Sequence, residues 1–385
     1  MSAKNGSAVS FRPGRGLIAT CMVLALFASA VFASTASAKK APPTATAYVA
    51  LGDSLSFGYK VSSQKSNEET NKAACEKGAA AALAKEQELF EEEEAKCNPV
   101  SGYEPGFVGE FAVKLAKSEK KANHTLQLMN MGCPGETSGG LIGNGDLGKE
   151  LENERAEKSE AALTVSSPCA YRYLAGWPLK TELEGGSELE AAVETIEEGK
   201  VPVTAVTFQI GSNDATGLVG KCKESAWYLE HGYKSLIECI SHEAGSEGYV
   251  YPGGGFAHIE TNIAVTIKVL RDAGYTGKIA IIGYYDTEAL ILPGSAQLFL
   301  LLNESVKAKV AAEAYGGNVK FVNIFPTFNP ETTLYKEGES SKEKEKLENK
   351  ERKTLTKLTE YPLNNDVHPT AFGYKTIAKL ISKAW

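Results

Sequence analysis

Short apolar runs alternate along the chain with longer segments in which apolar residues recur at helical spacing. Short runs bounded by turn residues are typical of buried strands, and apolar positions three or four residues apart are typical of helices. The pattern predicts strands at 48–51, 126–131, 203–210, 278–283 and 319–324. It predicts helices at 107–115, 147–158, 189–197, 259–273, 296–314 and 371–383.

Strands that alternate with helices indicate a parallel sheet covered by helices on both faces. We therefore predict an α/β fold, a three-layer α/β/α sandwich around a five-stranded, mostly parallel sheet. A chain of 385 residues with 43% apolar content can bury a core of this size as one domain, which we place at 47–385. Inserts are expected near 61–100, 145–200 and 336–360. The dense Lys and Glu residues of the last insert indicate an exposed charged helix or a mobile lid.

The N-terminus has the features of a secretory signal peptide. Arg12 and Arg15 precede an apolar stretch at 17–32, and Ala36-Ser37-Ala38 fits the small-residue cleavage pattern. We predict cleavage after Ala38, a signal peptide at 1–38, a mobile leader at 39–46 and a secreted product. An uncleaved membrane anchor is the alternative, but the apolar stretch is shorter than the ~20 residues needed to span a bilayer.

Seven cysteines remain to be explained, of which Cys21 falls within the predicted signal peptide. An even number of cysteines behind a signal peptide implies disulfides, although spacing alone leaves many pairings open. We favour pairs between neighbours in the sequence, Cys75–Cys97, Cys133–Cys169 and Cys222–Cys239. The cysteines and histidines match no zinc spacing, and we expect neither a metal nor a cofactor.

Chemistry-bearing residues cluster where the predicted strands end. Turns of small residues follow three strands, at 52–54, 132–138 and 211–214, and His368 precedes the last helix. In a parallel sheet these positions meet at the edge where the strands end, which is where ligands of open α/β sheets bind. Taken singly, each has a plain structural interpretation as a turn residue, a helix cap or a surface histidine. Taken together, in this order, they indicate a catalytic site.

Acyl transfer needs a nucleophile, a base within hydrogen-bond reach and donors aimed at the developing oxyanion. Ser54 fits the nucleophile and His368 the base. The oxyanion donors are then the backbone N–H groups of Ser54 and Gly135 and the side-chain amide of Asn213. We assign structural or surface roles to the remaining histidines, His124, His231, His242 and His258.

This constellation resembles the SGNH (GDSL) hydrolase family, and most closely its secreted, disulfide-containing bacterial esterases and lipases. The matching blocks are Gly52-Asp53-Ser54-Leu55, Asn130-x-Gly132-Cys133-Pro134-Gly135-x-Thr137, Gly211-x-Asn213-Asp214 and His368-Pro369. The resemblance implies a flavodoxin-like α/β/α domain and hydrolysis of carboxylic esters. It also implies the same roles for Ser54, His368, Gly135 and Asn213. One position departs from the family, because Asn365 stands where the family usually has an aspartate three residues before the histidine.

The departure raises the question of what orients His368. An unprotonated Nε2 must face Ser54, so Nδ1–H needs an acceptor. Asp366 is only two residues away, and in an extended stretch its side chain would point to the opposite side. We therefore predict a Ser54–His368 dyad in which the main-chain carbonyl of Asn365 accepts from Nδ1, with Asp366 dispensable. A triad completed by Asp366 is the alternative.

The sequence thus predicts a secreted serine ester hydrolase acting on a small-molecule or lipid ester. The rival enzyme class is a carbohydrate O-deacetylase with the same catalytic residues. The rival non-enzyme class is an inactive secreted binding module, which only Asn365 favours. A net charge of −7 without a basic cluster excludes nucleic acid as a partner, no stable membrane anchor is expected, and a monomer is the default.

Overall fold

The computed structural model describes residues 42–60, 105–142, 187–223, 238–240, 256–290, 295–312, 317–330, 340–361 and 363–385. Residues 43–385 form one compact unit. Its centre is a five-stranded sheet in the order β2-β1-β3-β4-β5. The strands are β1 (Thr44–Gly52), β2 (His124–Asn130), β3 (Val203–Gln209), β4 (Lys278–Ile282) and β5 (Val319–Val322). Each neighbouring pair is parallel, and this order is the flavodoxin-like one, so the predicted fold class is confirmed.

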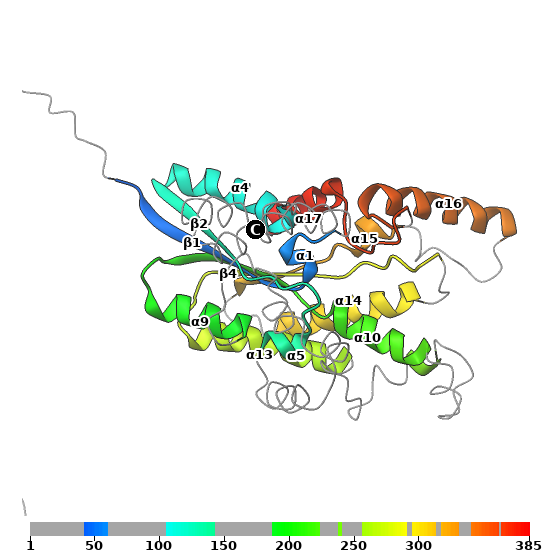
Figure 1. The fold of residues 1–385 in the computed structure, drawn as a ribbon, viewed down its shortest axis with the longest axis horizontal. Helices are drawn as coiled ribbons and strands as arrows, with labels where there is room; N and C mark the ends of the chain where they lie inside the picture. The colour runs from blue at the N-terminus through cyan, green and yellow to red at the C-terminus, as the bar shows by residue number, and fades with distance from the viewer. Residues whose placement is uncertain are drawn as a thin grey trace, which may run out of the picture. The chain divides into compact units, whose positions relative to one another are not determined.

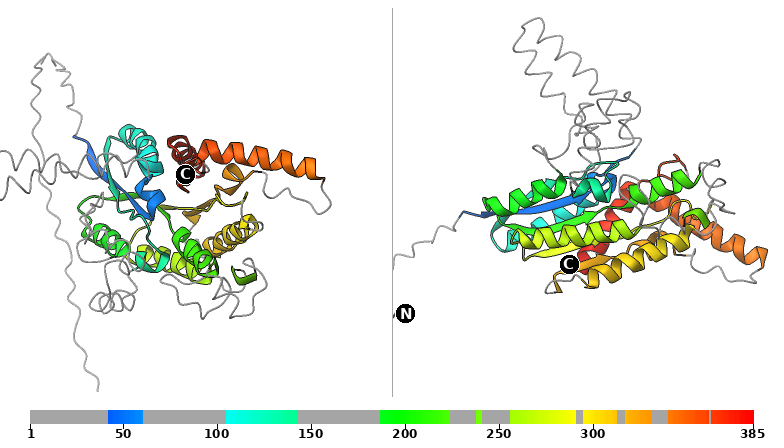
Figure 2. Two further views of the ribbon diagram at one scale, coloured as in Figure 1. Left: turned by 45° about the vertical axis from the view of Figure 1, so that its right-hand side comes forward. Right: turned by 90° about the horizontal axis from the view of Figure 1, so that it is seen from below.

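Helices cover both faces of the sheet. The longer ones are α4 (Gly106–Lys121), α9 (Glu188–Glu198), α10 (Ser212–Lys223), α13 (Phe256–Asp272), α14 (Ser295–Ala312), α16 (Ser341–Leu358) and α17 (Ala371–Ala384). The short ones are α1 (Ser54–Phe57), α5 (Ser138–Leu141) and α15 (Phe325–Phe328). Helices α4 and α17 lie on one side of the sheet, and α9, α13 and α14 lie on the other (Figure 1). The same layers are visible in the left view of Figure 2, and the right view looks onto the face of the sheet that α9, α13 and α14 cover.

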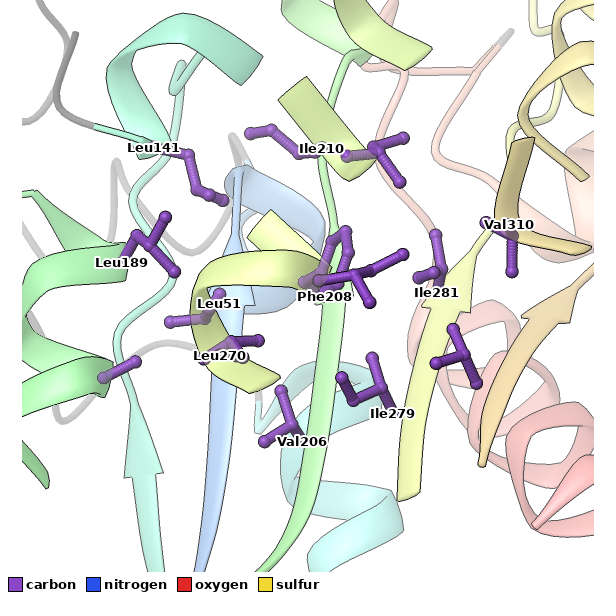
Figure 3. Packing of buried hydrophobic residues seen from close by; sticks show 14 of the residues in the cluster. Leu51, Leu141, Leu189, Val206, Phe208, Ile210, Leu270, Ile279, Ile281 and Val310 are labelled. Carbon is purple, nitrogen blue, oxygen red and sulfur yellow. The ribbon is translucent and has the colours of Figure 1, made fainter. Parts of the chain in front are cut away.

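Burial on both faces explains why the strands are apolar runs rather than alternating ones. Side chains of successive strand residues point to opposite faces. In β1, Val49 and Leu51 pack with α9 and α13, whereas Tyr48 and Ala50 pack with α4 and α17. Figure 3 shows the first of these two clusters, with Leu51 and Phe208 from the sheet beneath Leu270 of α13 and other helix residues.

Two predicted boundaries were wrong. Strand β1 begins at Thr44, so the leader predicted at 39–46 ends earlier; β-branched Thr44 pairs with His124, and Thr46 is buried. The insert predicted at 145–200 cannot extend to residue 200. Helix α9 lies within it, and Leu189 and Ala192 of this helix belong to the core. Helix α9 therefore belongs to the layer that covers the sheet.

The insert near 336–360 forms a helix, which agrees with the first of its two predicted structures. Helix α16 begins with a capping box between Ser340 and Glu343, and most of its residues are exposed. Glu351, Leu355 and Leu358 are buried, and these attach the helix to the domain. The predictions for 61–100 and for a helix at 147–158 lie outside the described residues.

The cysteine pairing is confirmed at one pair. Cys222 and Cys239 form a disulfide with a Cα–Cα distance of 5.9 Å. Cys133 is also disulfide-bonded, but the predictions for Cys75, Cys97 and Cys169 lie outside the described residues. The predicted signal peptide and its cleavage site lie there too. Within the described ranges, no helix combines the length and the apolar character that crossing a membrane requires.

Candidate active site

The end of β1 and the start of α1 form a tight turn that presents Ser54. Gly52 has φ +123°, and a Cβ atom there would lie 2.0 Å from the carbonyl oxygen of Gln209 on neighbouring β3. Asp53 then caps α1, its carboxylate accepting from the N–H of Leu55 at 2.9 Å. Only glycine fits the first position, and a capping side chain suits the second. The Gly-Asp-Ser sequence thus sets the local geometry that ends the strand and begins the helix at Ser54.

Ser54, His368 and Asp366 form a hydrogen-bonded chain. The hydroxyl oxygen of Ser54 lies 2.8 Å from Nε2 of His368, although 314 residues separate the two in sequence. Nδ1 of the same ring lies 2.5 Å from Oδ1 of Asp366. The Asp366 side chain is 3% exposed and that of His368 is 13% exposed. The carboxylate is therefore shielded from water, and Ser54 at the other end of the hydrogen-bonded chain is 7% exposed.

The expectation that the carbonyl of Asn365 holds His368 was wrong, because the Asp366 carboxylate occupies that position. The stretch is not extended at this point, since Asn365 has φ +52°. Oδ1 of Asp366 also accepts from the backbone N–H of His368 at 3.1 Å. This is an Asx-type turn, in which the side chain bonds to the backbone two residues on and so folds back toward His368. The side chain of Asn365 is exposed.

Contacts from neighbouring elements hold the loop that carries His368. The phenol of Tyr285, after β4, donates to the carbonyl of Val367 at 2.7 Å. The carbonyl of His368 accepts from the N–H of Glu360 at 2.8 Å. The ring of Tyr59 lies against the imidazole, with 4.7 Å between centroids. These contacts fix the imidazole in place before any substrate binds.

The predicted oxyanion donors lie on two loops that are joined to each other. Asn213 is in the first turn of α10, and its amide donates to the carbonyl of Glu136 at 2.8 Å. Glu136 directly follows Gly135, whose φ of +82° suits glycine. Cys133 N–H donates to the carbonyl of Gly52 at 2.7 Å, which holds the same loop against the Ser54 turn. An amide carries two N–H donors, so Asn213 can hold this loop with one and serve an oxyanion with the other.

The site lies at the topological switch point of the sheet. Ser54 follows β1 and Asn213 follows β3, and these strands are neighbours in the sheet but not in the sequence. The chain turns to opposite sides after this point, and ligands of open α/β sheets bind at such points, outside the carboxyl ends of the strands. The sequence prediction that these turns meet at one edge is consistent with this topology.

Other serines and histidines have different partners. The Ser56 hydroxyl is fully buried and donates to the carbonyl of Leu51 at 2.7 Å. The Ser138 hydroxyl donates to Asp214 at 2.7 Å. His124 contacts Glu119 at the surface, with Nδ1 2.9 Å from the carboxylate. His258 is exposed on α13, and the remaining two histidines lie outside the described residues.

A group of buried acids, which the sequence pattern did not predict, lies beneath the site. Asp53, Glu136, Glu188 and Asp214 are all at most 4% exposed. Burial raises the pKa of Asp53 to about 8, an effect that the N–H of Leu55 opposes. Burial likewise raises the pKa of Asp214 to about 7, against the two hydrogen bonds from Ser138. The sequence could have indicated two of these acids, because Asp53 and Asp214 adjoin Ser54 and Asn213 in the motifs.

The free energy of unfolding is expected to fall as pH rises from about 4 to about 8. In the unfolded chain an aspartate releases its proton near pH 3.9, whereas folded Asp214 and Asp53 hold theirs to about 7 and about 8. The folded state therefore binds more protons in this window, and raising the pH favours unfolding. Urea titrations across the window measure the slope, which Asp214→Asn should reduce. A free energy of unfolding that rises over the same window would contradict the assignment.

The sequence matches no protein-family model and no curated protein. The fold is similar to that of the extracellular lipase from Streptomyces rimosus, at 13% identity, with 88% of this chain and 100% of that one covered and a TM-score of 0.41. The lipase Lip_vut3 from a goat rumen metagenome gives 13% identity, coverages of 88% and 97%, and a TM-score of 0.40. A catalytic mutant of Axe2, an acetylxylan esterase from Geobacillus stearothermophilus, gives 11% identity, coverages of 89% and 94%, and a TM-score of 0.40. At identities and TM-scores this low, the likenesses do not assign an activity to the chain.

Proposed function

We propose that this chain is a secreted serine ester hydrolase of the SGNH (GDSL) type. The observation that carries the proposal is the hydrogen-bonded chain from Ser54 through His368 to Asp366, with contacts of 2.8 and 2.5 Å. This is the arrangement of a nucleophile, a base and a group that orients the base. Its place at the switch point of the sheet supports the same conclusion.

In the proposed mechanism His368 takes the proton of Ser54 at Nε2 while the serine oxygen attacks the ester carbonyl. Asp366 keeps the other imidazole proton on Nδ1 and stabilises the imidazolium that forms. The backbone N–H groups of Ser54 and Gly135 and the amide of Asn213 donate to the tetrahedral oxyanion. His368 returns its proton to the departing alkoxide, so that alcohol leaves and an acyl group stays on Ser54. Water, deprotonated by His368, then releases the acid.

Secretion is part of the proposal and rests on the cysteines and the N-terminal sequence. The Cys222–Cys239 disulfide and the disulfide-bonded state of Cys133 suit an oxidising compartment, where such bonds persist. The basic and apolar segments at the N-terminus, followed by Ala36-Ser37-Ala38, have the order of a signal peptide. N-terminal sequencing of the protein recovered from culture medium tests this part by itself, and a product that begins at Met1 would contradict it.

Asn213→Ala is expected to lower kcat by about 100-fold or more, because one oxyanion donor is typically worth ~3–4 kcal/mol of transition-state stabilisation. KM should change much less, since the oxyanion exists only after attack. Thr216→Ala is a matched control one turn along α10, where the hydroxyl is exposed and donates to the carbonyl of Ser212. Initial rates over a range of substrate concentrations separate the two constants. Equal kcat values in the two variants would remove Asn213 from the site.

The activity is tested with a serine-reactive phosphonate and a substrate panel. We expect covalent labelling at Ser54, found by peptide mass spectrometry, and hydrolysis of at least one member of a panel of short aryl esters, long acyl esters, phospholipids and acetylated glycans. Activity confined to acetylated glycans would make the chain a carbohydrate O-deacetylase with the same mechanism. Folded protein that neither reacts with the probe nor hydrolyses any ester would leave the binding-module alternative.

A further inference from the structure

Two buried glutamates meet beneath the proposed site. Glu136 follows Gly135 and is 4% exposed, and Glu188 is the first residue of α9 and is 1% exposed. One carboxylate oxygen from each, together with the sulfur of Cys133, lie within 4.8 Å of one another. The mechanism proposed above uses neither glutamate.

Each glutamate is attached to a different part of the site. Oε2 of Glu188 accepts from the backbone N–H of Gly52 at 2.6 Å, two residues before the nucleophile. Oε1 of Glu136 accepts from the N–H of Thr137 at 2.9 Å, within the loop that contains the oxyanion donor Gly135. The pair therefore connects the nucleophile turn to the oxyanion loop through the first residue of α9.

The surroundings of the second carboxylate oxygen of Glu188 indicate a proton between the carboxyl groups of Glu188 and Glu136. This oxygen, Oε1, is buried and has no hydrogen-bond partner among the residues that the structure describes. The groups whose charges act on Glu188 are Glu136 and Asp53, which are both acidic. Burial first, and then the charge of Glu136, raise the pKa of Glu188 well above its ordinary value. Two buried carboxyl groups this close cannot both ionise without strong repulsion, and a single proton placed between them removes it.

A metal ion fits the same place poorly. The sulfur of Cys133 is in a disulfide and cannot act as a thiolate ligand. Oε2 of Glu188 is already bonded to Gly52 N–H, which leaves few oxygens for an ion. Zinc sites ordinarily have four ligands and calcium sites six or more. A proton needs only one donor oxygen and one acceptor oxygen.

We propose that Glu188 is a positioning residue that shares one proton with Glu136 and thereby holds the nucleophile turn against the oxyanion loop. Oε2 accepts from Gly52 while Oε1–H donates to the Glu136 carboxylate. Loss of this proton at alkaline pH places two negative charges face to face and moves the Gly135 loop away from Ser54. The inference rests on the proposed function, because positioning is measured through ester hydrolysis.

The kinetic test compares Glu188→Gln, Glu188→Ala and, as a matched control, Glu190→Gln at an exposed position of the same helix turn. Alanine should lower kcat by about 100-fold with less effect on KM, as expected for misplacement of catalytic groups by about 1 Å. The glutamine amide can accept from Gly52 and donate to Glu136, so it should restore most of that loss. It should also shift the alkaline limb of the kcat–pH profile upward by about one unit or more, because the amide cannot lose its proton. Glu190→Gln should leave the profile unchanged.

A second measurement detects the proton without using activity. The infrared spectrum of the parent minus that of Glu188→Gln, both folded and at neutral pH, should contain the carbonyl band of one protonated carboxyl group. Bands from Asp53 and Asp214, whose pKa values are also raised, are common to both proteins and cancel. Absence of this band from the difference spectrum, or a Glu188→Gln profile with the parent's alkaline limb, would overturn the proposal. So would loss of the parent's activity on treatment with a chelator, which would indicate a cation between the glutamates. A parent protein that shows the band but hydrolyses no ester would refute the proposed function while leaving the shared proton in place.

Discussion

Ser54→Ala is expected to lower the turnover of ester hydrolysis by about a millionfold, as removal of a nucleophilic serine does in other serine hydrolases. The hydroxyl lies 2.8 Å from Nε2 of His368, so its loss removes both the attacking oxygen and the proton that the base accepts. Folding should be preserved, because Ser54 lies in a short helix that Asp53 caps through its own side chain. Initial-rate assays of the parent and long-incubation assays of the variant, on the same substrate, measure the change in turnover.

Ser56→Ala is the matched control for this variant. Ser56 lies in the same helix turn, but its hydroxyl is fully buried and donates to the carbonyl of Leu51 at 2.7 Å. We expect lower thermal stability, since a buried hydrogen bond is lost, and turnover within about tenfold of the parent. The phosphonate probe should label Ser56→Ala and leave Ser54→Ala unlabelled. The opposite labelling result would make Ser56 the nucleophile.

Asp366→Asn is expected to lower turnover by about 10⁴-fold, the effect of the corresponding change in other triads. The carboxylate oxygen at 2.5 Å from Nδ1 can only accept, so it keeps the proton on that nitrogen and leaves Nε2 able to accept from Ser54. An asparagine amide can donate to Nδ1 instead, which selects the wrong tautomer. Turnover within about tenfold of the parent would show that Asp366 is not the orienting group.

Asn365→Gly distinguishes the carboxylate from the neighbouring main-chain carbonyl. Glycine tolerates the φ of +52° at this position and keeps the carbonyl while removing the side chain. We expect turnover within about tenfold of the parent, in contrast to Asp366→Asn. A loss with Asn365→Gly as large as that with Asp366→Asn would return the orienting role to residue 365. Circular dichroism of both variants confirms that the comparison is between folded proteins.

The fold was predictable because both faces of the sheet are covered. A strand buried on both faces is an apolar run, and residues such as Val206 and Phe208 mark β3 in the sequence itself. The same signal is weaker where burial is partial. Thr44 begins β1 and pairs with His124, yet nothing in a Pro, Ala and Thr sequence separates it from the leader. Strand ends are decided by pairing partners that are distant in sequence.

The candidate site was predictable in its parts but not in its connections. Ser54, Asn213 and His368 each follow from a turn at a strand end or before a helix, because local residues fix such turns. The orienting acid was predicted wrongly, since the alternation that excluded Asp366 applies to extended chain and Asn365 is in the left-handed region. The role of Glu188 could not be predicted from the sequence. Acidic residues are common in the first turn of a helix, where they interact favourably with the helix dipole.

The sequence by itself determined the α/β class, the order of the described strands and helices and the residues that end the strands, and it predicted a serine and a histidine for acyl transfer. These follow from periodicity and turn chemistry, which act over a few residues. Only the tertiary structure decided that the Asp366 carboxylate contacts His368, and that Glu188 reaches Gly52 across 136 residues. Those contacts depend on a left-handed residue and on the packing of α9 against the sheet, and both are fixed by the whole fold rather than by neighbours in the sequence.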